Sequence, residues 1–154
     1  ITDRLGNEIV IDAADIAKRN PKMMPNGNMI DDHGFVYSKK TDGSVSSRVA
    51  NADEISSSGI QLDYKTISTA NPNKTPPQSA TPRNQAERNA FDHVKANPEK
   101  GKPITRELDT RFTSGGFQKL EQKITGPSGK NISIHYQYNS VTRKVVDVKV
   151  VSPI

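Results

Sequence analysis

Three polar residues near the end of the chain have the types and spacing of an acid–base site. His135 lies in an alternating pattern that predicts a strand over residues 131–138. Asp147 and Lys149 lie in a second such pattern, residues 145–150. Alternate residues of a strand point to opposite faces, so His135 falls on the face that the apolar residues leave free. Two strand pairings keep the apolar residues together, and they place His135 opposite either Asp147 or Lys149.

An imidazole beside cations has the chemistry to cleave RNA without a metal ion. The reaction needs a base for the ribose 2′-hydroxyl, cations for the charged phosphorane and an acid for the leaving 5′-oxygen. Histidine titrates near neutral pH and serves as base or acid. Asp147 would orient His135 or pair with Lys149. A solvent-facing histidine beside a plain ion pair fits the same pattern.

The two predicted strands form a C-terminal hairpin whose apolar rows face one core. The residues expected in these rows are Ile132, Ile134, Tyr136 and Tyr138, and then Val146, Val148 and Val150. The opposite face would carry Ser133, His135 and Gln137 together with Arg143, Val145, Asp147 and Lys149. Alternation therefore assigns Tyr136 to the core.

The preceding segments predict helices that cover this sheet. Residues 84–98 begin with Asn84 as a helix cap, and Ala86, Ala90, Phe91 and Val94 form one apolar stripe. Residues 105–112 suggest a short helix, and residues 115–124 a strand or a brief helix. His93 falls off the apolar stripe and is expected at the surface. We predict an α+β fold in which helices pack on a twisted antiparallel sheet that ends in the C-terminal β-hairpin.

The N-terminal part of the chain reads as short strands with one helix. Residues 8–12, 34–49 and 59–67 show strand patterns, the second with a hairpin turn at Asp42-Gly43, and residues 13–20 suggest a helix. Residues 31–34, Asp-Asp-His-Gly, are a weak metal-binding pattern without a spaced partner. We predict an N-terminal lobe over residues 1–66, a Pro/Ser/Thr-rich linker over 67–84 and a basic α+β nuclease core over 85–154.

Composition narrows the classes of function. The chain of 154 residues has no cysteine, so disulfides, cysteine zinc sites and thiol nucleophiles are excluded. No apolar run approaches the roughly 20 residues that span a bilayer, so we expect no stable membrane insertion. From Gln85 onward twelve Lys and Arg face seven Asp and Glu, which accounts for the whole net charge of +5. A basic field confined to one part of the chain favours a polyanionic partner such as nucleic acid.

Residues 108–150 also carry a series of short motifs. These are Arg-Phe at 111–112, a lysine-bearing segment around Lys119, Ile-His-Tyr at 134–136, Asn-x-x-Thr at 139–142 and Asp-x-Lys at 147–149. In this series the chain resembles the extreme C-terminal modules of bacterial polymorphic toxins, of the contact-dependent inhibition (CdiA-type) and Rhs types. The family usually has Gly after the Thr where this chain has Arg143, a departure that concerns the turn more than the chemistry.

The resemblance implies an antibacterial toxin domain, an RNase of barnase-, EndoU-, colicin- or RelE-like architecture. It would be displayed or secreted as part of a larger protein and act in the cytoplasm of a target bacterium. The implied partners are RNA, with tRNA favoured, and a cognate immunity protein, which we expect to be acidic. A cytoplasmic protein of the target cell is a further partner that we consider. No cofactor and no metal ion are expected.

Carried over position by position, the motifs mark Arg111, Lys119, His135, Tyr136, Asn139, Thr142, Asp147 and Lys149. The resulting hypothesis is a metal-independent endoribonuclease with His135 as general acid–base. The catalytic set is then His135, Lys149, Asp147, Arg111, Tyr136 and Thr142, and the RNA phosphate contacts are Lys119, Arg143 and Lys144. Asn139 and Thr142 also suit the turn itself. The alternatives are a nucleic-acid-binding module without catalysis and a metal-dependent DNase toxin, and residues 1–66 suit a binding or translocation lobe.

Overall fold

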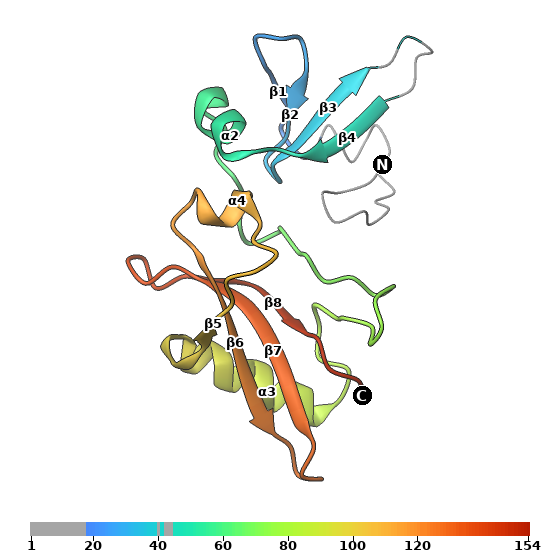
Figure 1. Cartoon of the computed structure of the whole chain (residues 1–154), viewed down its shortest axis with the longest axis vertical. Coiled ribbons are helices and arrows are strands. Elements are labelled where there is room, and N and C mark those ends of the chain that lie inside the picture. The colour runs from blue at the N-terminus through green and yellow to red at the C-terminus, as the bar shows by residue number, and fades with distance from the viewer. Residues whose placement is uncertain (1–17, 40, 42–44) are drawn as a thin grey trace. The chain divides into compact units, whose positions relative to one another are not determined.

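The chain divides into two compact units, Ile1–Asp63 and Tyr64–Ile154. We describe them from a computed structural model in which residues 18–39, 41 and 45–154 are placed. Each unit contains an antiparallel sheet of four strands, and helices accompany both sheets (Figure 1). The predicted α+β class is therefore confirmed. The strand expected at 8–12 and nearly all of the helix expected at 13–20 lie outside the described residues.

The first unit is a meander of short strands followed by one helix. Its sheet has the order β1 (Lys22–Met23), β2 (Met29–Ile30), β3 (Phe35–Lys39) and β4 (Val45–Val49). Pairing of β3 with β4 confirms the hairpin predicted over 34–49, whose turn residues 42–44 lie outside the described part. Two apolar clusters flank the sheet: Met24, Ile30, Val36 and Ala50 in one, and Phe35, Tyr37 and Val49 in the other.

A buried carboxylate organises the turn before β3. Asp31 is fully buried and accepts hydrogen bonds from the backbone N–H groups of His33 and Phe35, each at 2.9 Å. The Tyr37 hydroxyl donates to the same carboxylate at 2.6 Å, and burial raises the pKa of that tyrosine. The weak metal-binding pattern at 31–34 thus coincides with a carboxylate that closes a turn.

Helix α2 (Ala52–Ser58) occupies a segment for which no helix was predicted. Its first turn is closed by a capping box, in which Asn51 and Glu54 bond each other's backbone N–H groups. The strand predicted at 59–67 is wrong, because this segment has no strand structure. The apolar residues of this segment pack in different places. Ile60 packs against the core of the first unit. Tyr64 is the first residue of the second unit and contacts Phe117 there, with 4.7 Å between the centroids of the tilted rings.

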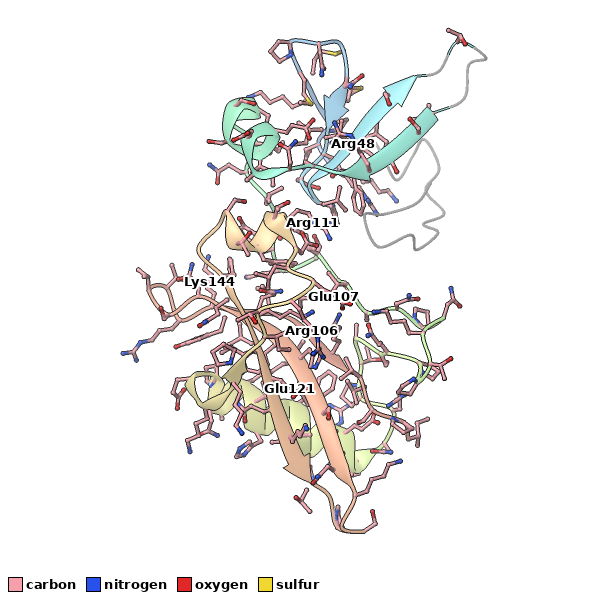
Figure 2. The ribbon with its side chains drawn as sticks, in the orientation of Figure 1. Arg48, Arg106, Glu107, Arg111, Glu121 and Lys144 are labelled. Atoms are coloured by element: carbon pink, nitrogen blue, oxygen red, sulfur yellow. The ribbon has the colours of Figure 1, made fainter. Side chains whose placement is uncertain are left out.

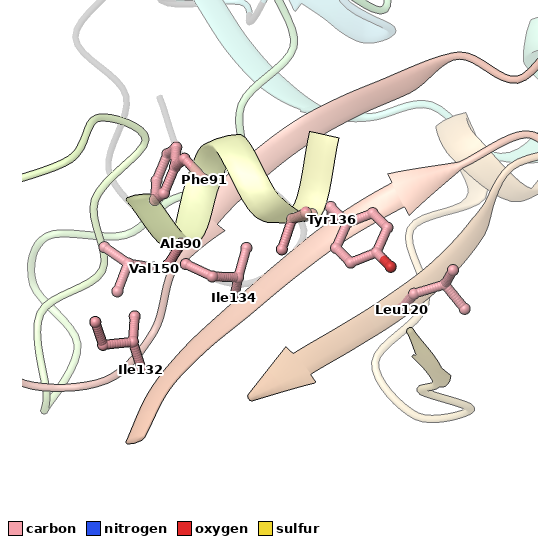
Figure 3. Close-up of a cluster of buried hydrophobic side chains, with 8 residues drawn as sticks. Ala90, Phe91, Leu120, Ile132, Ile134, Tyr136 and Val150 are labelled. Atoms are coloured by element: carbon pink, nitrogen blue, oxygen red, sulfur yellow. The ribbon is translucent and has the colours of Figure 1, made fainter. Parts of the chain in front are cut away.

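The second unit packs one helix on one face of its sheet. The sheet has the order β5 (Lys102–Pro103), β6 (Gln118–Thr125), β7 (Asn131–Tyr138) and β8 (Val145–Val150). Helix α3 (Gln85–Ala96) crosses β7 and β8, with apolar side chains between helix and strands (Figure 3). The 3₁₀ turn η1 (Pro98–Lys100) connects α3 to β5, and the short helix α4 (Thr110–Thr113) lies between β5 and β6.

Helix α3 confirms the most detailed of the sequence predictions. Asn84 caps it by accepting a hydrogen bond from the Glu87 N–H at 2.8 Å. The stripe of Ala86, Ala90, Phe91 and Val94 packs against the side chains of Ile132, Ile134, Tyr136, Val150 and Leu120. His93 is exposed, as expected.

The proline-rich segment 67–84 is part of the second unit and does not join two separate units. It has almost no regular structure, as its composition predicts, but it runs along the outer edge of β8 (Figure 1). Ser79 exchanges two backbone hydrogen bonds with Val150, at 3.1 and 2.9 Å. Arg83 pairs with the buried Glu87 at 2.7 Å and donates to the Ser152 carbonyl. The division of the chain therefore falls between residues 63 and 64.

We expect Tyr136→Phe to destabilise the fold. The Tyr136 hydroxyl donates to the Pro98 carbonyl at 2.6 Å and accepts from the Gln122 amide at 3.0 Å, and all three groups lie in or beside the core. Removing it leaves the Pro98 carbonyl without this donor and the Gln122 amide with only the Asn97 carbonyl as acceptor, so the free energy of unfolding in urea should fall by about 1–3 kcal/mol. Tyr138→Phe is the control and should stay within about 0.5 kcal/mol of wild type. Equal effects of the two substitutions would contradict this role.

Candidate active site

An extra residue in β8 decides which of its side chains face which way. Val150 pairs with Ile134 and Lys149 with His135, but Val146 pairs with Gln137, so two residues of β8 lie opposite Tyr136. Such a β-bulge reverses the alternation along the strand. Val145, Val148 and Val150 face α3, whereas Val146 and Lys149 face away from it. The predicted rows were therefore wrong for Val145 and Val146.

Four charged or titratable residues form a row across the whole sheet on the face turned away from α3. Lys102 of β5 lies opposite Glu121 of β6, Glu121 opposite His135 of β7, and His135 opposite Lys149 of β8. Directly opposite residues share a face, with Cβ atoms about 5 Å apart. We call these four residues the cross-strand row. Of the two pairings that the sequence left open, the structure has the one with Lys149.

His135 is held by a carboxylate at the centre of the row. Its Nε2 lies 2.7 Å from Oε2 of Glu121, and its side chain is 18% exposed. Burial lowers the pKa of His135, the hydrogen bond and charge of Glu121 oppose this, and the charges of Lys119 and Lys149 add to the lowering. A carboxylate only accepts, so Nε2 carries the hydrogen of the neutral ring and Nδ1 keeps its lone pair. This is the arrangement of a general base.

Lys149 and Asp147 are joined through the hydroxyl of Thr69. Lys149 is buried, and its Nζ donates to Thr69 Oγ1 at 2.9 Å. The Thr69 hydroxyl donates in turn to Asp147 Oδ2 at 2.5 Å, and the Thr69 N–H donates to Asp147 Oδ1 at 2.7 Å. Burial lowers the pKa of Lys149 and raises that of Asp147, and each charge works against the shift of the other. Asp147 is therefore linked to Lys149 through Thr69, and Glu121, not Asp147, orients His135.

Lys119 adds a second cation beside the row. It lies opposite Gln137 on the same face of the sheet, two residues along the strands from the pair of Glu121 and His135. Burial lowers the pKa of Lys119, and the carboxylates of Glu107 and Asp147 act in the other direction. Its ammonium group has no hydrogen-bond partner within the described ranges, which leaves it able to take up an anion. Gln137 is buried, and its Oε1 also lacks a partner there.

The other residues of the predicted site lie away from His135. Tyr136 is on the opposite face of the sheet, with its hydroxyl held by Pro98 and Gln122, so a direct catalytic role is wrong for it. Thr142, Arg143 and Lys144 are exposed on the β7–β8 turn, whose first strand pair, Tyr138↔Val145, lies about 10 Å along β7 from His135. Figure 2 shows Lys144 on this turn, well apart from Glu121 on β6.

The β7–β8 turn has its own structural logic. Asn139 Oδ1 accepts hydrogen bonds from the N–H groups of Val141 and Thr142 at 3.0 and 3.1 Å. Thr142 Oγ1 accepts from the Lys144 N–H. Arg143 has φ of 61°, a left-handed conformation that favours Gly. Asn139 and Thr142 are thus turn residues, and Arg143 keeps the turn geometry without the glycine.

Arg111 lies in the neighbourhood of the site but is engaged in an ion pair. It is buried at the start of α4, where Asp109 caps the helix and its carboxylate lies 2.7 Å from the guanidinium group. Its charge opposes the rise in the pKa of Asp147 that burial causes. Arg111 therefore contributes positive field rather than a free phosphate contact.

Sequence reasoning missed Glu121, Thr69 and Lys102. The alternation in residues 118–125 puts Glu121 on the same face as Lys119, so a strand prediction for this segment would have placed the Glu121 carboxylate on that face. Thr69 lies 78 residues from Asp147 in a proline-rich segment, and no local pattern indicates that contact.

Two negative findings concern the described residues alone. Within residues 18–39, 41 and 45–154, no group of three or more His, Asp or Glu side chains is arranged to hold a metal ion. None of the helices placed there has the length and apolarity required to cross a membrane.

We expect Thr69→Val to weaken the second unit far more than Thr69→Ser. Valine keeps the shape of threonine but leaves Lys149 Nζ and Asp147 Oδ2 without the hydroxyl between them. Loss of a hydrogen bond to buried charged groups should lower the free energy of unfolding by about 1–3 kcal/mol. Thr69→Ser keeps the hydroxyl and should remain close to wild type in urea unfolding. Equal stability of the two variants would show that the hydroxyl does not join these charges.

Comparisons of this chain with protein-family models, with curated proteins and with solved structures find no match. The resemblance of residues 108–150 to polymorphic toxin modules therefore remains a prediction.

Proposed function

We propose that the second unit is a metal-independent endoribonuclease and the working part of an antibacterial toxin. The observation that supports this best is the contact of His135 Nε2 with Glu121 Oε2 at 2.7 Å, with Lys149 directly across the next strand pair. A base held by a carboxylate next to two cations is the set of groups that phosphodiester transesterification requires. The excess positive charge of the chain lies in the same unit.

In the proposed reaction Nδ1 of His135 takes the proton of the ribose 2′-hydroxyl. The 2′-oxygen then attacks phosphorus, and the bond from phosphorus to the 5′-oxygen breaks. Lys119 and Lys149 stabilise the negative charge of the phosphorane. Lys119 is the more accessible of the two, and its lowered pKa makes it a stronger acid than an ordinary lysine, so we assign to it the proton for the leaving oxygen. Asp147 and Thr69 hold Lys149 in place.

The biological setting follows from the resemblance of residues 108–150. We propose that the domain is carried by a larger secreted or surface-displayed protein and acts on RNA, in the first place tRNA, in the cytoplasm of a target bacterium. An acidic cognate immunity protein would suit the basic unit. In this proposal Arg143 and Lys144, on the β7–β8 turn, contact phosphates outside the cleavage centre.

We expect His135→Ala to reduce RNA cleavage by about 100- to 10,000-fold while the fold remains intact. The purified wild type and variant would each be incubated with total bacterial RNA and EDTA. Each would also be expressed in a bacterium, and the ends of the cellular RNA would be sequenced. Wild type should arrest growth and create discrete new RNA termini.

His93→Ala is the matched control, because His93 is exposed on α3 and lies away from the row. It should cleave like wild type. Full activity of His135→Ala would overturn the proposal. RNA binding without fragments would favour a binding module, and plasmid cleavage that EDTA abolishes would favour a metal-dependent DNase.

The pH profile of cleavage provides an independent test through Glu121→Gln. Burial lowers the pKa of His135, so the acid limb of kcat/KM for wild type should lie below the ordinary histidine value of about 6.5. Glu121 is the group that raises this pKa, whereas a glutamine still accepts the Nε2 hydrogen but carries no charge. In Glu121→Gln the acid limb should therefore move to still lower pH, and the plateau rate should fall because the imidazole is a weaker base. A shift to higher pH would contradict the assignment of His135 as base.

A further inference from the structure

A second cationic surface adjoins the cross-strand row at its β5 end. A hollow of about 310 Å³ is lined by Lys100, Lys102, Lys123, Glu121 and Gln122. Its three lysines come from η1, β5 and β6, so three separate elements direct cations to one place. Glu121 belongs both to this hollow and to the contact with His135, which makes the hollow the immediate neighbour of the candidate active site.

The charges of this hollow are available to a ligand. Lys100, Lys102 and Lys123 are exposed, and over the described ranges their ammonium groups have neither an ion-pair nor a hydrogen-bond partner. The carboxylate of Glu121 is already bonded to the imidazole of His135. The hollow therefore has three ammonium groups without a partner in the described part of the chain and one carboxylate, Glu121, that is already bonded to His135. This gives it a local excess of positive charge that is exposed to solvent.

The end of β5 keeps the hollow open. β5 pairs with β6 only at Lys102↔Glu121 and Pro103↔Leu120, whereas β6 continues to Thr125. The outer edge of β6 beyond Glu121 is therefore uncovered by β5. An extended chain that crosses the row can continue into the hollow without meeting a strand.

We propose that this hollow, the lysine hollow, is a phosphate subsite for the single strand of nucleic acid that continues beyond the bond cleaved at His135. The inference rests on the proposed nuclease function and adds the path of the bound nucleic acid strand. The strand enters beside Lys149 and Lys119 and passes His135. It then continues to the lysines of the hollow, Lys102, Lys100 and Lys123. Contacts of this kind bind the backbone and do not read the bases.

Salt dependence measures such contacts without any cleavage. The probe is a fluorescein-labelled single-stranded DNA of about ten nucleotides, which carries the phosphates but lacks the 2′-hydroxyl that the reaction needs. Each lost phosphate contact to a single strand reduces the slope of log K against log salt by about 0.7, so Lys100→Gln with Lys123→Gln should reduce it by about 1.4.

The control is the full-length chain with Arg88→Gln and Lys95→Gln. These two exposed cations lie on α3, on the other side of the sheet, and their removal changes the net charge by the same amount. The control should keep the wild-type slope. Equal slopes for the two double variants would overturn the subsite.

Cleavage distinguishes the subsite from the catalytic proposal. Lys100→Gln with Lys123→Gln should lower kcat/KM for an RNA of ten nucleotides by at least tenfold and leave cleavage of a dinucleotide unchanged, because the shorter substrate does not reach the hollow and neither lysine belongs to the cross-strand row. An equal loss on both substrates would contradict the inference. If His135→Ala cleaves normally while the salt slopes separate as expected, the subsite stands and the nuclease mechanism fails.

Discussion

The candidate site depends on the bulge that Asp147 introduces into β8. Val145 faces α3, and in a regular strand Lys149, four residues later, would face α3 as well. The extra residue shifts the alternation, so Lys149 emerges on the other face, opposite His135. Asp147 has φ of 52°, a left-handed conformation that disfavours side chains by about 1–2 kcal/mol. The hydrogen bonds from Thr69 and the charge of Lys149 offset that cost.

Burial and nearby carboxylates have opposite effects on the pKa values of His135, Lys149 and Lys119. Removal from water disfavours the charged forms of His135, Lys149 and Lys119, and the lysines also repel one another and the imidazolium. The carboxylate of Glu121 opposes the lowering of the pKa of His135, and the carboxylate of Asp147 opposes the lowering of the pKa values of Lys149 and Lys119. Because burial lowers the pKa of His135, its imidazole is neutral near pH 7 and able to accept a proton.

Local patterns in the sequence predict α3, β7, β8 and the face of His135, but they do not predict β5 or the bulge, and they leave β6 open between strand and helix. The Asn84 cap and the apolar stripe determine α3, and alternation determines β7 with His135 away from the core. In residues 145–150 the valines at 146, 148 and 150 share one parity and Val145 has the other, so alternation favours a regular strand and does not show where the strand changes face. The partners Glu121 and Thr69 come from a neighbouring strand and a distant segment, which only the tertiary fold brings together.

The segment 67–84 shows how an irregular stretch becomes part of a site. Its prolines prevent a helix or a continuous strand, yet its backbone groups still need partners when they lie against the sheet. Thr69 N–H bonds Asp147, Gln78 N–H bonds the Asn71 carbonyl, and Ser79 bonds Val150 in both directions. Short polar side chains of the segment form hydrogen bonds to nearby backbone groups, as Asn71 does to the Asn73 N–H. The same kind of side chain, the hydroxyl of Thr69, lies between Lys149 and Asp147. The composition that predicts a linker is therefore equally suited to a segment that forms one side of the candidate active site.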